Sequence, residues 1–166
     1  MMKKSLFTAL IICSFFFVAQ AQGYKTAVGL RLGYPASVSL KHFISEKGAV
    51  EVFAGYRGYS GYSWFNVGAA YEHHSPIESV DGLQWYFGGG AAAYFWRWND
   101  GFVYGDAGST SFGILGTLGL DYKFEDYPVN LSADWMPLFA LNGFNNGFYG
   151  GYGALSVRYT LKGGDK

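Results

Sequence analysis

The sequence predicts an all-β chain that folds as an eight-stranded antiparallel up-and-down transmembrane β-barrel. Apolar and polar residues alternate with a period of two over eight stretches, and the charges inside those stretches fall on one parity. The composition combines 20% aromatic residues and 25 glycines with only 14% charged residues. A soluble domain has about 25% charged residues, and this alternation is typical of strands that bury one face.

The N-terminus is expected to be removed from the folded protein. Lys3 and Lys4 precede an apolar run over 6–18, and Ala19-Gln20-Ala21 has the pattern of a cleavage site. These features predict a secretory signal peptide over 1–21, which leaves a barrel domain over 22–166. The apolar run is shorter than the ~20 residues that a membrane-spanning helix needs.

The first four strands are expected over 27–34, 38–41, 50–57 and 65–72. Each has its apolar residues at every second position. In chain order these positions are Val28, Leu30, Leu32 and Tyr34; Val38 and Leu40; Val50, Val52, Ala54 and Tyr56; and Phe65, Val67, Ala69 and Tyr71.

The last four strands are expected over 83–95, 112–123, 129–135 and 154–161. The same period of two identifies them. Their apolar positions include Leu83, Trp85, Phe87 and Phe95; Phe112, Ile114, Leu118, Leu120 and Tyr122; Val129, Leu131, Ala133 and Trp135; and Leu155, Val157, Tyr159 and Leu161.

The charged residues indicate which parity faces inward. The parity that carries them is otherwise rich in Gly, Ala, Ser and Asn, small residues that suit the narrow interior of an eight-stranded barrel. In a soluble lipocalin-like barrel, the alternative, this parity would form a water-facing surface poor in charge. We therefore expect lipid against the apolar parity and a lumen charge network of Arg31, Lys41, Glu51, Arg57, Glu72, Asp121, Lys123, Asp134 and Arg158.

This network comprises five positive and four negative residues. A nearly neutral set in a narrow lumen predicts a plug of ion pairs, because an unpaired buried charge is costly. Lys41 and Glu51 should face each other across a short turn. We expect most of the set to cluster in the periplasmic half of the lumen, with three members higher: Arg31, Arg57 and Asp134.

Aromatic residues and connections predict the orientation. Aromatic residues of the apolar parity gather near both strand ends, as in two interfacial belts; Tyr34 and Tyr56 belong to one belt, and Trp85 and Tyr159 to the other. The connections 45–48, 75–82 and 125–128 are short, whereas 97–111 and 139–151 are long. Outer-membrane barrels have short periplasmic turns, so we expect an outer-membrane monomer with both termini in the periplasm.

Six stretches carry a family resemblance: VGLRLGY over 28–34, LKHF over 40–43, WYFGGG over 85–90, GTLGLDYKF over 116–124, DWMP over 134–137 and LSVRY over 155–159. They resemble the small OmpA/OmpX-type outer-membrane β-barrels, in the form common in Bacteroidetes-type Gram-negative bacteria. The resemblance covers essentially all of 22–166. It implies contact with outer-membrane lipid and insertion by the barrel-assembly machinery, and it implies no particular activity.

One cluster has residue types that suit catalysis or metal binding: Glu72, His73, His74 and Ser75. Neighbouring strand residues point to opposite faces, so the two histidines cannot hold one ion together. A lipid-modifying barrel enzyme would need Ser, His and an acid at the outer leaflet, whereas this cluster lies at the expected periplasmic end. The sequence therefore predicts no catalytic site, metal or cofactor.

The overall charge excludes one class of partner. The chain has 12 Lys and Arg against 12 Asp and Glu, whereas nucleic-acid binding needs an excess of basic residues. We expect a structural or surface-interaction role with a non-conducting interior. The alternatives are a narrow porin-like pore for water or small ions and an enzyme that modifies lipid.

Overall fold

The computed structural model describes residues 24–98, 110–143 and 146–161, so the signal peptide predicted over 1–21 lies outside the described residues. Within these ranges, no helix is long and apolar enough to cross a membrane. The strands are β1 (Thr26–Tyr34), β2 (Ser37–Phe43), β3 (Gly48–Gly58), β4 (Tyr62–Pro76), β5 (Leu83–Trp98), β6 (Thr110–Lys123), β7 (Val129–Trp135), β8 (Leu138–Ala140), β9 (Gly147–Tyr149) and β10 (Gly153–Leu161).

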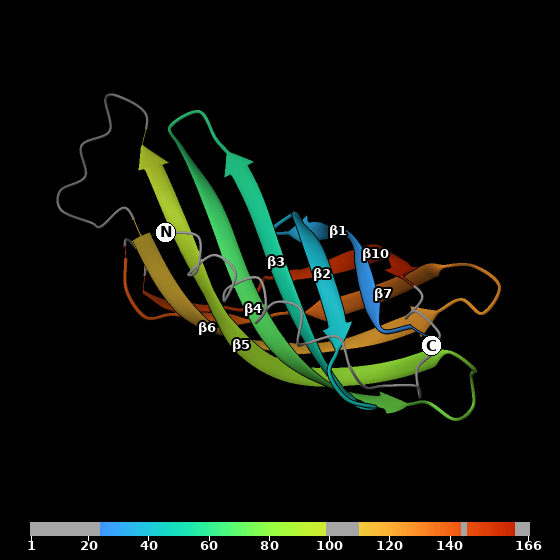
Figure 1. Ribbon diagram of the computed structural model, residues 1–166. Helices are drawn as coiled ribbons and strands as arrows, with labels where there is room; N and C mark the ends of the chain where they lie inside the picture. Colours follow the sequence, from blue (N-terminus) through green and yellow to red (C-terminus); the bar gives the residue numbers. More distant parts are fainter. Residues whose placement is uncertain (1–23, 99–109, 144–145, 162–166) are drawn as a thin grey trace, which may run out of the picture.

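Eight of these segments close a ring, which confirms the eight-stranded antiparallel up-and-down barrel. Each of β1 to β6 pairs with the next strand in the chain, β7 pairs with β6 and β10, and β10 pairs with β1. All pairings are antiparallel. Figure 1 shows the closed arrangement, with the blue β1 beside the red β10.

The strands are staggered around the ring. If the paired residues are followed from Ser111 of β6 through β5, β4, β3, β2, β1, β10 and β7, the path returns to β6 at Asp121, ten residues further along. A barrel closes only when its strands tilt and shift in this way. The stagger brings residues that lie far apart in the chain to the same height in the interior.

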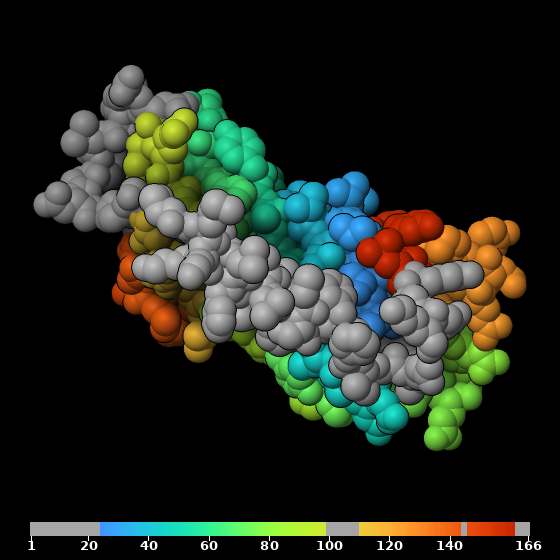
Figure 2. Space-filling view, in the orientation of Figure 1, coloured from blue at the N-terminus to red at the C-terminus, as the bar shows by residue number. Residues whose placement is uncertain are grey.

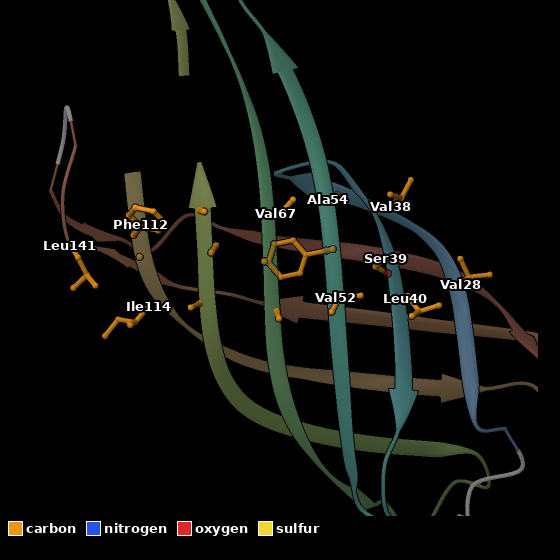
Figure 3. Close-up of a pocket in the computed structure, with 17 residues that line it drawn as sticks. Val28, Val38, Ser39, Leu40, Val52, Ala54, Val67, Phe112, Ile114 and Leu141 are labelled. Carbon is orange, nitrogen blue, oxygen red and sulfur yellow. The ribbon is translucent and has the colours of Figure 1, made fainter. Parts of the chain in front are cut away.

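The two faces of a strand lie in different environments, one exposed on the outside of the barrel and one buried inside it. Along β10, Leu155, Val157 and Tyr159 are 64%, 47% and 56% exposed, whereas the intervening Ser156 and Arg158 are each 1% exposed. Outward apolar side chains also cover β1 to β4 and β6, where Figure 3 shows Val28, Val38, Leu40, Val52, Val67, Phe112 and Ile114. The apolar parity therefore faces out and the polar parity faces in, as the sequence predicts.

The strands differ in length on the two sides of the barrel. β4, β5 and β6 have 15, 16 and 14 residues, whereas β1, β2 and β7 have nine, seven and seven. The longer strands project beyond β1 at one end, where Figures 1 and 2 show the green and yellow segments at the upper left. We call this end the loop end; the opposite end, with Tyr24 and Leu161, is the terminal end.

A tight turn at the terminal end depends on a glycine. Gly82 immediately precedes β5 and has a φ of +78°, which residues with a side chain rarely adopt. A Cβ atom there would lie 2.4 Å from the carbonyl oxygen of Lys123, which the turn packs against. The absence of a side chain at Gly82 therefore allows the start of β5 to pack closely against the end of β6.

The connection expected over 139–151 is not entirely a loop, and this part of the prediction is wrong. β8 continues the line of β7 beyond Met136 and Pro137 and pairs with β6, and β9 pairs with β8. The amide of Gly116 donates a hydrogen bond to the carbonyl oxygen of Pro137 over 2.9 Å, which bridges the break. Period two resumes after the proline, because Leu138 is buried and Phe139 is 48% exposed.

Candidate functional site

Seven of the nine predicted lumen charges meet in one interior network, and it includes Arg31 and Asp134, which the sequence places higher than the others. They come from seven different barrel strands, and their side chains are each 4% exposed or less. A charge at such a position is tolerated where it is paired. We call this set the ion-pair network: Arg31, Lys41, Glu51, Glu72, Asp121, Asp134 and Arg158.

Glu51 of β3 lies between two arginines. Arg31 Nη1 is 3.1 Å from Glu51 Oε1, and the same oxygen accepts a hydrogen bond from Arg158 Nη2. Arg31 also donates through Nη2 to Asp134 Oδ1 over 2.7 Å. One guanidinium therefore joins β3 to β7 across the lumen, using donors on a planar fork.

Arg158 of β10 uses each of its three nitrogens. Nε donates to the Ser39 hydroxyl over 2.9 Å and Nη1 donates to the Ser132 hydroxyl over 2.7 Å, while Nη2 binds Glu51. These partners lie on β2, β7 and β3. Arg158 therefore connects the last barrel strand to three others.

Lys41 of β2 binds two further carboxylates. Its Nζ lies 2.8 Å from Glu72 Oε2 and 3.2 Å from Asp121 Oδ2, and it also lies 4.4 Å from the centre of the Tyr86 ring. Lys41 and Glu51 are direct partners in the β2–β3 register, yet the carboxylate of Glu51 binds the two arginines instead. The register sets the heights of the two residues, and the stagger of the barrel brings in the partners.

Uncharged donors complete the coordination of the aspartates. Asn130 Nδ2 donates to Asp121 Oδ1 over 2.6 Å, and the Tyr24 hydroxyl contacts the same oxygen at 3.5 Å. The Tyr86 hydroxyl donates to Asp134 Oδ2 over 3.2 Å. Sequence reasoning missed these three donors, although Tyr86 and Asn130 stand on the inward parity.

His74 extends the network toward the terminal end. Its Nε2 lies 3.0 Å from Glu72 Oε2 and its Nδ1 lies 3.1 Å from Gln84 Oε1, while its ring stacks on Tyr86 with centroids 4.8 Å apart. The network contains three cations and four carboxylates, so it has one more negative group than positive groups. Glu72 Oε1 has no hydrogen-bond partner, unlike either oxygen of Glu51.

The other two predicted charges lie outside the network. Arg57 is half-buried at the loop end, with its guanidinium 4.6 Å from the centre of the Tyr34 ring and 5.2 Å from that of Tyr59. Lys123 is the last residue of β6, half-buried at the terminal end. Both stand near strand ends, beyond the region that opposing walls enclose.

A small apolar cluster closes the interior below the network. Tyr24, Ala27, Phe43 and Ala49 are each 5% exposed or less. The Tyr24 and Phe43 rings pack edge to face at 5.3 Å, and Phe43 also contacts the His74 ring at 4.9 Å. Burial raises the pKa of the Tyr24 hydroxyl well above its ordinary value, so this phenol stays neutral.

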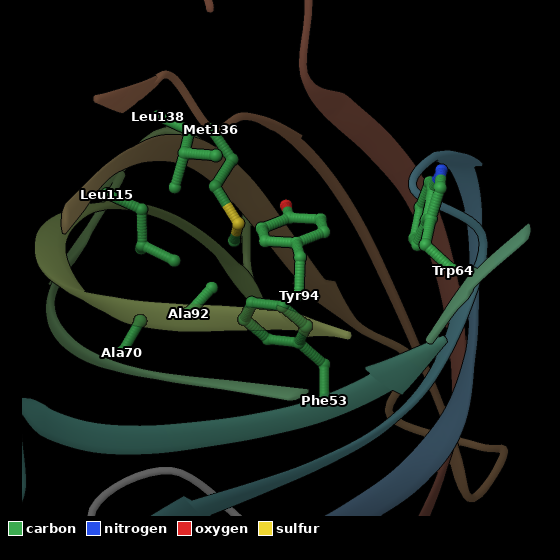
Figure 4. Close-up of a cluster of buried hydrophobic side chains, with 8 residues drawn as sticks. All are labelled: Phe53, Trp64, Ala70, Ala92, Tyr94, Leu115, Met136 and Leu138. Atoms are coloured by element: carbon green, nitrogen blue, oxygen red, sulfur yellow. The ribbon is translucent and has the colours of Figure 1, made fainter. Parts of the chain in front are cut away.

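Above the network, toward the loop end, the interior is filled by apolar side chains. Met136 and Leu138 extend inward from one wall and Phe53 from the other, as Figure 4 shows. The Phe53 ring also lies 5.5 Å from the guanidinium carbon of Arg31, so the two layers touch. We call this set the apolar layer: Phe53, Ala70, Ala92, Leu115, Met136 and Leu138.

Aromatic side chains surround a cavity of about 250 Å³ at the loop end. We call these residues the aromatic cup: Tyr34, Tyr62, Tyr94, Trp96, Tyr149 and Tyr152. The sequence places Tyr34 in the outer aromatic belt, and that expectation is wrong, because its ring packs against Tyr152 at 5.0 Å. The chain turns at Pro35 directly after this residue, so strand parity no longer fixes its direction. Tyr94 and Trp96 stand on the inward parity of β5, a signal that could have identified the cup.

The catalytic or metal-binding arrangement considered for residues 72–75 is not assembled in the described residues. His73 points outward and packs against Phe87 at 5.6 Å, while His74 is fully buried beside Glu72. Within the described ranges, no group of three His, Cys, Asp or Glu side chains could hold a metal ion.

The chain matches no protein-family model and no curated protein sequence. Among solved structures it is similar to the N-terminal β-barrel domain of Pseudomonas aeruginosa OprF, with a TM-score of 0.59 and 16% identity over 86% of this chain and 100% of that one. It is also similar to neisserial surface protein A (NspA), with a TM-score of 0.57 and 16% identity over 82% of this chain and 93% of that one. At this identity the likeness shows the fold alone, which is a closed eight-stranded antiparallel barrel.

Proposed function

We propose that the protein is a monomeric outer-membrane β-barrel with a structural or surface-interaction role and a non-conducting interior. The observation that carries this proposal is the inverted distribution of polarity: charged side chains are buried inside and large apolar side chains are exposed outside. Such a surface suits lipid and would be unfavourable in water. The fold shared with OprF and NspA supports the same location.

The layered interior supports a closed lumen. The small apolar cluster around Tyr24 and Phe43, the ion-pair network and the apolar layer follow one another along the axis, and their side chains are buried. An ion crossing the barrel would have to separate paired charges and displace apolar groups. Both steps cost several kcal/mol.

One observation favours the alternative, a narrow pore for water or small ions. Several buried polar atoms have no hydrogen-bond partner, namely the side-chain atoms of Asn66, Thr117 and Ser156 and one oxygen of Glu72. Interior water molecules would satisfy such atoms. The apolar layer fills the interior between the ion-pair network and the loop end, so we favour isolated interior waters over a continuous file.

The proposed role involves no catalysis. His74 and Glu72 already bind each other and their neighbours, and His73 faces the opposite way. With the terminal end in the periplasm, the barrel would present its longer connections outside. It would contact outer-membrane lipid and require the barrel-assembly machinery for insertion.

Reconstitution tests the proposal directly. The protein refolded into phospholipid vesicles should migrate faster on a denaturing gel without heating than after boiling, because a closed barrel resists detergent. In a planar bilayer it should give no resolvable single-channel current. Equal mobility in both gel lanes would contradict the membrane barrel. Steady single-channel conductance would contradict the closed interior and favour the narrow pore.

A further inference from the structure

We propose that the aromatic cup is a binding site for a single neutral sugar ring, a hexopyranose, that enters from the loop end. This inference rests on the proposed surface-interaction role and specifies its ligand chemistry. The cup combines ring faces from β1, β4, β5 and β9 with hydroxyl groups, and its lower side is closed.

The size of the cavity limits the ligand to one small ring. Its volume is about 250 Å³, just below the ~300–1,000 Å³ of pockets for drug-sized ligands. Leu138 belongs both to the cavity wall and to the apolar layer, so that layer forms the floor. A ligand would therefore bind in the cup without passing through the barrel.

The walls offer flat apolar faces. Tyr149 and Tyr152 are stacked with centroids 5.9 Å apart on one side, and Tyr94 and Trp96 are stacked at 6.3 Å on β5. A pyranose ring has C–H bonds on its faces, which pack against aromatic rings, and hydroxyl groups around its edge. Aromatic side chains with a polar atom at the tip suit such a mixed surface.

Polar atoms of the cup can bind the ring hydroxyls. Ser111 lines the cavity and accepts a hydrogen bond from Trp96 Nε1 over 3.0 Å, so its own hydroxyl proton remains to be donated. Burial raises the pKa of the Tyr152 hydroxyl to about 12, so this group is a neutral donor and acceptor at physiological pH. Such convergent polar groups in an apolar pocket fix the orientation of a ligand.

The lining also selects against charged ligands. None of the nine described residues that line the cavity is charged. The guanidinium of Arg57 is nearby, but it stacks on the Tyr34 ring. A charged sugar would lose its hydration without gaining a partner of opposite charge, which is unfavourable.

Binding can be measured on the full barrel refolded in detergent. The titrants are D-glucose, D-galactose and D-mannose with their methyl glycosides, and tryptophan fluorescence and calorimetry report binding. Free sugars that bind better than their glycosides would indicate a free ligand, and equal binding would indicate the end of a glycan chain. D-glucuronate and p-cresol serve as charged and aromatic comparators. We expect at least one neutral hexose to saturate the protein, and glucuronate not to bind.

A matched pair of variants locates the site. Tyr149 points into the cup, and its neighbour Phe148 on β9 points outward with 67% exposure. Tyr149→Ala should weaken sugar binding roughly tenfold, equivalent to about 1.4 kcal/mol, whereas Phe148→Ala should leave it unchanged. Trp96→Phe should reduce the fluorescence change. Both alanine variants should keep the heat-dependent gel mobility, which shows that the barrel is intact.

Three results would overturn the proposal. Binding of p-cresol without any hexose would replace the sugar with an aromatic ligand. Absence of binding by every probe would remove the site, and equal loss in both alanine variants would place binding outside the cup. Failure of the proposed function is distinct, because a protein that is not a membrane barrel would show no heat-dependent mobility even without ligand.

Discussion

The two halves of the barrel interior fill the same kind of space with different chemistry. Near the terminal end, seven charged side chains from seven strands are held by specific pairs, such as Arg31 with Asp134 at 2.7 Å. Near the loop end, Leu115, Met136 and Phe53 fill the space through apolar contact, and aromatic rings surround a cavity. The stability of the terminal-end half depends on specific ion pairs. The stability of the loop-end half depends on how completely apolar side chains fill the space.

This difference has consequences for substitution. A buried ion pair loses most when one partner is removed, because the other charge is then uncompensated. An apolar layer loses in proportion to the cavity created, and it tolerates exchange between residues of similar volume. Changes that conserve shape should therefore cost more stability in the ion-pair network than in the apolar layer.

The largest effect is expected for Glu51→Ala. It removes the carboxylate that binds Arg31 and Arg158 and leaves two buried guanidinium groups with fewer partners. The free energy of unfolding should fall by about 3–5 kcal/mol, measured by urea titration in detergent or lipid vesicles. Glu125→Ala, at an exposed position, is the control and should change little. An unchanged midpoint for Glu51→Ala would mean an open, hydrated lumen and would favour the pore.

Leu115 in the apolar layer tests the other half. Leu115→Ala should cost about 2–3 kcal/mol by creating a cavity, whereas Leu115→Met should cost less than about 1.5 kcal/mol. Glu51→Gln also conserves shape, but it should cost more than Leu115→Met because it removes charge. A similar loss of stability for Leu115→Met and Glu51→Gln would contradict the proposed difference between the two halves.

A smaller effect is expected for Glu72→Gln. Glu72 Oε1 has no hydrogen-bond partner, and the network has one more carboxylate than cations. Neutralising Glu72 corrects that imbalance, while Lys41 keeps its contact with Asp121 at 3.2 Å. We expect a loss below about 1 kcal/mol, clearly less than for Glu51→Gln under the same urea titration. A larger loss for Glu72→Gln than for Glu51→Gln would show that Glu72 contributes more to the stability of the network.

The smallest effect concerns alkaline pH at the cup. Burial raises the pKa of Tyr152 to about 12 from its ordinary value of 10.0, so the folded state holds this proton more tightly than the unfolded state. The associated stability is present below pH 10 and is lost as pH rises toward 12. Tyr152→Phe should flatten the decline in unfolding midpoint over this range. An identical decline in both proteins would assign it to other groups.

The sequence was sufficient for the barrel because one pattern determines most of it. Period two at positions such as Leu155, Val157 and Tyr159 identified a strand and its outward face together. The same parity placed Arg158 and Glu51 inside. It could not pair them, because the pairing depends on the stagger between strands, which no single strand encodes.

Departures from the sequence-based expectation occur where strand parity ends. Arg57, Lys123 and Tyr34 stand near strand ends, and their side chains follow local turns or the rim of the barrel. The sequence did not predict β8 and β9, because Pro137 interrupts the alternation of apolar and polar residues from which strands are identified. The aromatic cup requires five segments to converge, which is a property of the closed barrel.

The position of Arg158 on the last barrel strand links neutralisation of the lumen to the final step of assembly. Its partner Glu51 lies on β3, and among the cations of the preceding strands Arg31 is the one that forms an ion pair with this carboxylate. The pairing of β1 with β10 brings Arg158, the second cation that binds Glu51, into the lumen. A register error of one residue would turn Arg158 to the outer face of the barrel, so a shift of one residue in β10 loses its ion pair with Glu51.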